Sequence, residues 1–457
     1  MSTIPNIDQH IYVVPSFTLE CGTELKEAPV AYKTWGRLNE ARDNVMVICH
    51  ALTGSADVED WWGPLMGRNK AFDPSRFFIF CANALGSPYG SASPVTINPA
   101  TGRPYGPAFP PTSIRDDVRI HYRVLAEHLH VQRVAVVIGG SMGGMAALEW
   151  PLLAPPHFVT RIAVLATSAR HSAWCIAWGE SQRQSIYSDP AYKDGLYAPA
   201  EQPRSGLAAA RMCALLTYRS RDSFERRFGR NVHLAVAPAP MPRDDGAGEG
   251  LMTPPASPAH EHEAAELHND GHRNASVGGS DASARAPPMA PKPPIFSAQS
   301  YLRYQGEKFI ARFDANCYIH ITRKMDTHDI ARGRVHEATA PLDDPDGDLL
   351  LSQTLAALPP RALVISIQSD GLFTPPEQAL LACHIPDSAL ITIPSGEGHD
   401  GFLVEFEEIN RCVLGWLRGE FAGMYEGAEE DGREGEDDFS VKKESVFGEA
   451  EVDFVRW

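Results

Sequence analysis

One short segment constrains the possible fold of this chain more than any other: residues 139–144, which read Gly-Gly-Ser-Met-Gly-Gly. An apolar run at 134–138 precedes it, and a run typical of a helix follows at 145–150. This order predicts a strand, a sharp turn and a helix, with the hydroxyl of Ser141 at the tip of a strained turn. Glycine is needed two residues either side of the serine, because the strand and helix backbones approach too closely for a Cβ atom. Since Gly-x-Ser-x-Gly occurs once in 457 residues, Ser141 is the candidate nucleophile.

Two later strands supply the base and the orienting group that a serine nucleophile needs. The apolar run 362–367 leads to Asp370, and the run 389–394 leads to a loop that carries His399. Taken singly, an aspartate or a histidine after a strand is more often a surface or capping residue. Here both follow strands that end at one edge of the predicted sheet, in the chain order serine, aspartate, histidine that this arrangement requires. We therefore expect Ser141, Asp370 and His399 to form a catalytic triad.

Acyl chemistry also needs an oxyanion hole, which is a pair of hydrogen-bond donors for the developing negative charge. The backbone N–H of Met142, directly after the nucleophile, is one candidate and benefits from the helix N-terminus. The second donor should come from the loop 50–54, which follows a predicted strand at 45–49. We expect it to be the backbone N–H of Leu52, although by sequence alone this loop could be an ordinary connection between a strand and a helix.

The order of predicted elements indicates an α/β fold. Short alternating runs within 10–40 predict an antiparallel β start, and continuous apolar strands then alternate with helices, which favours a mostly parallel sheet covered on both faces. Strands are expected near 45–49, 76–82, 134–138 and 161–166, with a helix at 116–129. The strand pattern stops after residue 170 and returns near 362, with helices predicted between at 174–187, 208–218 and 300–330. Helices inserted at such a place usually form a lid over the serine.

This pattern divides the chain into the first part of the α/β core (1–170), a helical lid insertion (171–345), the second part of the core (346–422) and a C-terminal tail (423–457). Within the insertion, residues 235–297 are rich in Pro, Ala, Gly, His, Asp and Glu, and bury too little apolar surface to offset the entropy of ordering. We predict that this segment is disordered. Residues 425–440 hold eight acidic side chains against one arginine, which is typical of a solvated acidic tail.

Composition excludes several classes of function. The formal net charge of −17 argues against nucleic acids and anionic membranes as main partners. The eight cysteines include no Cys-x-x-Cys pair, so neither a disulfide framework nor a metal site is expected. The N-terminus lacks the basic and apolar regions of a signal peptide, and no apolar run reaches the roughly 18 residues of a membrane span. These features predict a cytoplasmic protein.

Eight stretches, several of them far from the catalytic turn, carry a family resemblance: residues 49–57, 83–90, 139–145, 182–187, 216–218, 300–309, 312–318 and 398–405. Among them are Asn-Ala-Leu-Gly-Ser-Pro-Tyr-Gly at 83–90 and Gly-His-Asp-Gly-Phe-Leu-Val-Glu at 398–405. On these motifs the chain resembles the homoserine O-acetyltransferases, which have the α/β-hydrolase fold and use acetyl-CoA. The resemblance covers about residues 10–230 and 298–420. The segment 235–297 and the acidic tail depart from the family pattern, but neither contains a motif.

The resemblance also implies roles for residues that spacing alone does not identify. Ser141, Asp370 and His399 correspond to the family's triad, and the N–H groups of Leu52 and Met142 to its oxyanion hole. Arg211 corresponds to the arginine that holds the homoserine carboxylate, with Tyr218 lining the same pocket. Asp400 corresponds to the carboxylate that receives the substrate ammonium. These roles suit a zwitterionic amino acid, which needs one fixed cation and one fixed anion.

The implied reaction is ping-pong acetyl transfer from acetyl-CoA to L-homoserine, in methionine biosynthesis, by a homodimer with no bound cofactor. Alternatives stay open at this point. A relative that acetylates L-serine or uses succinyl-CoA would differ by about one methylene or one carboxylate in its pocket. An esterase or thioesterase would use the same triad. A family member that acts on a β-lactam intermediate and a non-catalytic binding module with a decayed site are further alternatives.

Overall fold

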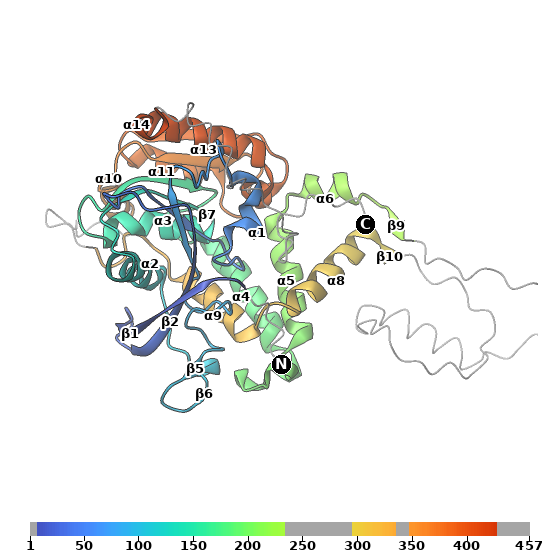
Figure 1. The fold of residues 1–457 in the computed structure, drawn as a ribbon. Coiled ribbons are helices and arrows are strands. Elements are labelled where there is room, and N and C mark those ends of the chain that lie inside the picture. The colour runs from blue at the N-terminus through green and yellow to red at the C-terminus, as the bar shows by residue number, and fades with distance from the viewer. Residues whose placement is uncertain (1–6, 234–294, 335–346, 427–457) are drawn as a thin grey trace, which may run out of the picture. The chain divides into compact units, whose positions relative to one another are not determined.

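The computed structural model describes residues 7–233, 295–334 and 347–426. Its centre is an eight-stranded sheet with the order β1-β2-β4-β3-β7-β8-β11-β12 (Figure 1). The first two strands pair antiparallel, and every neighbouring pair from β4 to β12 is parallel. The strands are β1 (His10–Thr18), β2 (Glu24–Trp35), β3 (Val45–Cys49), β4 (Phe78–Ala82), β7 (Val134–Gly140), β8 (Val159–Leu165), β11 (Leu363–Ile367) and β12 (Ala389–Ile393).

The central strands are buried along their whole length, which explains why their sequences are continuous apolar runs rather than alternating ones. Successive side chains still point to opposite faces. In β3, Val45 and Val47 join one core cluster, whereas Met46 and Ile48 join the other. Helices cover both faces, as the sequence predicts. The first cluster includes side chains of α2 (Ile114–Arg123), α3 (Met142–Leu153), α10 (Asp348–Ala356) and α11 (Pro375–His384), and the second includes side chains of α1 (Val58–Trp62) and α13 (Phe406–Glu420).

The connection between β8 and β11 is helical, as predicted, with one correction. The expected continuous helix at 300–330 is two helices, because Asp314 has an extended backbone and its side chain accepts a hydrogen bond from the N–H of Cys317, which caps a new helix. Likewise α2 ends at Arg123, and a π-helical turn continues to His128. The helices are α4 (Ala173–Tyr187), α5 (Arg204–Tyr218), α6 (Arg221–Arg227), α8 (Ser297–Ile310) and α9 (Ala315–Asp326).

The described residues fall into two compact units, 7–226 with 302–426, and 227–301 without its undescribed middle. The second unit contains two strands that the sequence did not predict, β9 (Val232–His233) and β10 (Ile295–Phe296), which pair antiparallel. Strands of two residues are too short to show a hydrophobic period. The predicted disorder at 235–297 is wrong for its last three residues, which lie in β10 and at the start of α8; residues 235–294 and 427–457 lie outside the described chain.

Within the first unit, α9 is tied to α2 by a buried ion pair. The ammonium of Lys324 lies 2.7 and 2.8 Å from the two carboxylate oxygens of Asp117 and donates to the carbonyl of Leu85 at 2.6 Å. A hydrogen bond of 2.8 Å between Thr112 and His320 joins the same helix to the segment before α2. Losing either partner of a buried ion pair leaves an uncompensated charge, which costs about 3–5 kcal/mol. These contacts therefore fix α9 against the core.

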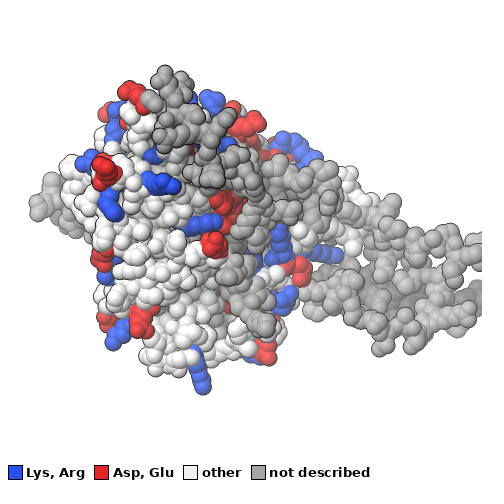
Figure 2. Space-filling view, in the orientation of Figure 1, with Lys and Arg blue, Asp and Glu red and all other residues white. Residues whose placement is uncertain are grey.

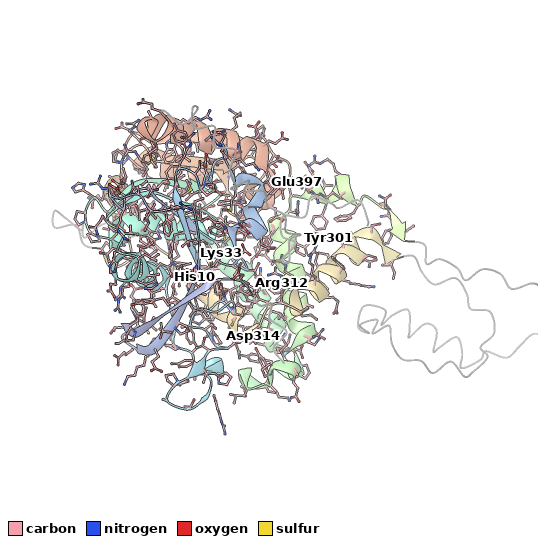
Figure 3. All side chains as sticks on the ribbon, viewed as in Figure 1. His10, Lys33, Tyr301, Arg312, Asp314 and Glu397 are labelled. Carbon is pink, nitrogen blue, oxygen red and sulfur yellow. The ribbon has the colours of Figure 1, made fainter. Side chains whose placement is uncertain are left out.

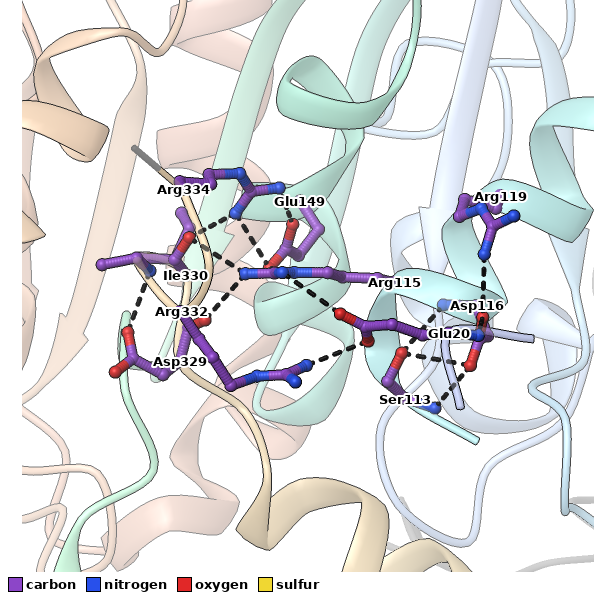
Figure 4. Close-up of polar contacts among 11 residues, drawn as sticks. Glu20, Ser113, Arg115, Asp116, Arg119, Glu149, Asp329, Ile330, Arg332 and Arg334 are labelled. Carbon is purple, nitrogen blue, oxygen red and sulfur yellow. Dashed lines mark hydrogen bonds and ion pairs between the residues drawn. The ribbon is translucent and has the colours of Figure 1, made fainter. Parts of the chain in front are cut away.

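A second polar network lies on the outside of α3, the helix that follows Ser141 (Figure 4). Glu149 of α3 is fully buried and binds Arg115 of α2 at 3.0 Å and Arg334 at 2.6 Å. Arg115 also donates to the carbonyls of Asp329 and Ile330, so the segment after α9 is held against α2 and α3. The helix that directly follows the candidate nucleophile is thus fixed by ion pairs on its outer side.

Charged side chains of both signs are interspersed over the described part of the face in Figure 2. None of the helices within 7–233, 295–334 and 347–426 is both long and apolar enough to cross a membrane.

The turn between β7 and α3 leaves no space for a side chain at Gly139 or Gly143. An ideal Cβ at Gly143 would lie 2.0 Å from the carbonyl oxygen of Cys49, and one at Gly139 would lie 2.2 Å from the carbonyl oxygen of Gly143. Both neighbours are backbone atoms, which cannot rotate away. The requirement for glycine on either side of Ser141 therefore has a direct steric cause.

We predict that Gly143→Ala lowers the free energy of unfolding by about 1–3 kcal/mol or more, because an extra methyl group in a filled site forces the backbone to shift. Gly415→Ala is the matched control: Gly415 lies inside α13 with no atom within 4 Å of the added Cβ. That change should be neutral or stabilise the helix by up to about 1 kcal/mol. Chemical denaturation of both variants checks the prediction, and equal stability of the two would contradict it.

Candidate active site

Ser141 occupies the strained position that its sequence context predicts. It lies between the end of β7 and the start of α3, with φ 55° and ψ −125°, a backbone conformation that a residue with a side chain rarely adopts. Its N–H donates to the carbonyl of Leu165 at 3.0 Å, and the hydroxyl of Thr167 donates to its carbonyl at 2.7 Å. The neighbouring strand β8 and the segment directly after it therefore hold both the N–H and the carbonyl of Ser141.

The structure brings together the three residues that the sequence assigns to a triad. The hydroxyl oxygen of Ser141 lies 2.9 Å from Nε2 of His399, and Nδ1 of His399 lies 2.7 Å from a carboxylate oxygen of Asp370. All three residues are buried. Because a carboxylate only accepts, Nδ1 carries the proton, and Nε2 is left to accept the proton of Ser141.

Asp370 is itself fixed by the backbone. Its second carboxylate oxygen accepts hydrogen bonds from the N–H groups of Leu372 and Phe373, at 2.8 and 2.9 Å. The rings of Phe373 and Phe402 lie 5.1 and 5.0 Å from the imidazole of His399, centroid to centroid. The base is thus oriented by a fixed carboxylate and bordered by apolar rings. Exclusion of water strengthens electrostatic interactions in such a site.

Two loops that leave the sheet side by side carry the expected oxyanion donors. Cys49, the last residue of β3, pairs with Gly139 of β7, so the loop 50–54 begins beside the turn of Ser141. Leu52 lies in this loop. Met142 is the first residue of α3, where backbone N–H groups have no acceptor within the helix.

Two further residues, to which the sequence assigned no role, hold this loop. His50 donates through Nδ1 to the carbonyl of Ala51 and accepts the N–H of Ala84 at Nε2, both at 2.9 Å. Arg312, which follows α8 (Figure 3), donates to the carbonyl of Thr53 at 3.2 Å and to the hydroxyl of Tyr89 at 2.8 Å. Both residues lie in motifs noted above, but apart from Ala51 their partners are 34 to 259 residues away. No local pattern could have paired them.

The three expected substrate-binding residues lie close to the triad. The guanidinium of Arg211, in α5, is buried over the rings of Phe309 and Tyr218, at 5.0 and 5.6 Å. The ring of Tyr218 lies 6.2 Å from that of His399. Asp400 directly follows His399, and its carboxylate lies 2.8 Å from Nε of Arg219. A buried cation and a buried anion therefore both lie near the base.

Cys175, whose thiol contacts the loop after Asp370, is not activated as a nucleophile. Cys175 donates its thiol to the carbonyl of Leu372 at 3.2 Å, and burial raises its pKa to about 12, which keeps it protonated at neutral pH. Within the described ranges, no three His, Cys, Asp or Glu side chains are grouped so that they could hold a metal ion.

Comparisons with known proteins agree with this geometry. Residues 44–406 match the family model described as the alpha/beta hydrolase fold. The chain is 53% identical to a homoserine O-acetyltransferase of Cryptococcus neoformans, over 99% of this chain and 96% of that protein, and 49% identical to one of Saccharomyces cerevisiae, over 97% and 93%. A solved structure of homoserine O-acetyltransferase from Bacillus anthracis superposes with a TM-score of 0.68 at 21% identity, covering 91% of this chain and 98% of that one, and so supports the fold. The predicted α/β-hydrolase fold with a mostly parallel sheet is confirmed, and the chain belongs to the homoserine O-acetyltransferases of the α/β-hydrolase superfamily.

Proposed function

We propose that this protein transfers an acetyl group from acetyl-CoA to the γ-hydroxyl of L-homoserine, with acetyl-Ser141 as a covalent intermediate. The observation that carries the proposal is the continuous hydrogen-bonded chain from Asp370 through His399 to Ser141, at 2.7 and 2.9 Å, in a chain that belongs to this family. The proposed products are coenzyme A and O-acetyl-L-homoserine.

In the first half-reaction, His399 takes the proton of Ser141 while the serine oxygen attacks the thioester carbonyl. The N–H groups of Leu52 and Met142 bind the oxygen of the tetrahedral intermediate. Collapse of the intermediate breaks the carbon–sulfur bond, and the imidazolium returns its proton to the leaving thiolate. Asp370 fixes the tautomer of His399 and stabilises its charged form.

In the second half-reaction, homoserine takes the place of coenzyme A. Arg211 binds its carboxylate and Asp400 its ammonium, which places the γ-hydroxyl against the acetyl group. His399 takes the proton of this hydroxyl while the hydroxyl oxygen attacks the acetyl carbonyl. The bond between the acetyl carbon and the Ser141 oxygen then breaks, and the imidazolium returns the proton to Ser141. The helices α4, α5 and α9, which share an apolar cluster with Met142, act as the lid that keeps water from competing with homoserine. We also propose that the protein is a homodimer, which a measurement of its molecular mass in solution tests.

We predict that Ser141→Ala lowers kcat by about 10⁴-fold or more, because the covalent route is lost while the oxyanion donors remain. Steady-state release of coenzyme A measures the effect, and an unchanged unfolding midpoint shows that the variant is folded. Turnover near that of the wild type would refute the covalent route.

We predict that the wild-type enzyme prefers homoserine with acetyl-CoA over the other three pairings of homoserine or serine with acetyl- or succinyl-CoA. One methylene is worth about 1–3 kcal/mol, so a preference of roughly 10–200-fold over serine is expected. Mass spectrometry of the acylated amino acid, together with assay of free acetate, decides between the pairings. Preference for serine or succinyl-CoA would reassign the substrates, and acetate as the main product would make the enzyme a hydrolase.

A further inference from the structure

Arg219 lies immediately after α5 and binds two carboxylates of the loop that carries the base. Its Nη1 lies 2.8 Å from Glu397, and its Nε lies 2.8 Å from Asp400. These two carboxylates flank Gly398 and His399 in the chain. The side chain of Arg219 is only 4% exposed, so it is part of the interior rather than a surface cation.

The segment after α5 and the loop of His399 are also joined by a hydrogen bond and by a close approach of their backbones. The hydroxyl of Ser220 donates to the carbonyl of Gly396 at 2.5 Å. An ideal Cβ at Gly398, whose φ is +74°, would lie 2.4 Å from the backbone nitrogen of Ser220. The two segments are therefore in direct contact, and the position of Arg219 relative to the loop is fixed.

Glu397 anchors the guanidinium on its far side. Its carboxylate accepts a hydrogen bond from the hydroxyl of Ser223 at 2.7 Å (Figure 3). It also lies 3.4 Å from Arg226, whose side chain is 62% exposed. With one arm held by a hydrogen bond of 2.8 Å to Glu397, the planar guanidinium of Arg219 lies against Asp400 as an ion pair, with Nε 2.8 Å from the carboxylate. A lysine, with one rotatable ammonium, could not hold two carboxylates in this geometry.

We propose that Arg219 is a positioning residue for recognition of the substrate amino group: it orients the Asp400 carboxylate that receives the ammonium of homoserine. The inference rests on the proposed function. Arg219 does not itself touch the substrate; it sets the position of the Asp400 carboxylate through the ion pair. Since Arg211 and Tyr218 belong to α5 and Arg219 directly follows it, this helix and its C-cap residue then position the groups that bind both ends of the amino acid.

The test compares Arg219→Gln with Arg226→Gln in the full-length enzyme. Both changes remove a guanidinium that contacts Glu397, but the contact with Asp400 belongs to Arg219. Three rates are measured: release of coenzyme A on mixing with acetyl-CoA alone, discharge of the acetyl-enzyme by homoserine, and discharge by 4-hydroxybutanoate, which is homoserine without its amino group.

We expect Arg219→Gln to lower discharge by homoserine about 30-fold or more, the effect of removing one partner of a buried charge pair. The other two rates should fall by no more than about threefold, and Arg226→Gln should leave all three within about twofold, the range for an exposed pair. Arg219→Lys should fall between wild type and Arg219→Gln, and it replaces the glutamine variant if that variant does not fold.

Equal losses with homoserine and 4-hydroxybutanoate would show a purely structural role and overturn the inference. So would an unchanged rate with homoserine. The proposed function is tested separately by the wild-type enzyme in the same experiment: absence of acetyl transfer to homoserine there would contradict the function itself, whatever the variants do.

Discussion

The arrangement of the site depends on one hydrogen bond, between Ser141 and His399, which joins positions 258 residues apart in the chain. The bond forms because β7, β8, β11 and β12 are neighbouring parallel strands of one sheet. The segments that follow β7, β11 and β12 therefore leave the same edge of the sheet. The sheet register and the strained turn set the position of the hydroxyl. Asp370, which is fixed by two backbone N–H groups, determines the orientation of the His399 imidazole. The remaining parts of the site are arranged around this pair.

Much of the fold and of the candidate site could be predicted from the sequence, because the relevant signals are local. Buried parallel strands are continuous apolar runs, so β3 was predicted to the residue. The edge strand β12 is largely exposed, but it is also an apolar run and was predicted to within one residue. The turn at Ser141 has a sterically required glycine pattern, and Asp370 and His399 each follow such a strand. The roles of Arg211, Tyr218 and Asp400 came from the family resemblance rather than from spacing, and they remain proposals supported by their proximity to His399.

What could not be predicted depends on contacts between distant segments. The break between α8 and α9 is set by the side chain of Asp314, which interrupts an otherwise helical pattern. The partners of His50 and Arg312 lie far along the chain, and nothing near either residue indicates them. Arg219 is similar: next to Tyr218 it reads as an ordinary arginine after a helix, and only the fold places two carboxylates against it. The domain boundaries and the compartment stay predictions from sequence.

The central claim is that a serine hydroxyl becomes the transient carrier of the acetyl group, and intact-protein mass spectrometry after mixing with acetyl-CoA alone tests it most directly. The account predicts a gain of about 42 daltons, the mass of acetyl replacing hydrogen in an acyl-enzyme, located by peptide mapping to Ser141 and removed on adding homoserine. An enzyme that acetylates homoserine at full rate yet never shows this adduct, even with rapid quenching, would contradict the account and indicate direct transfer between the two substrates.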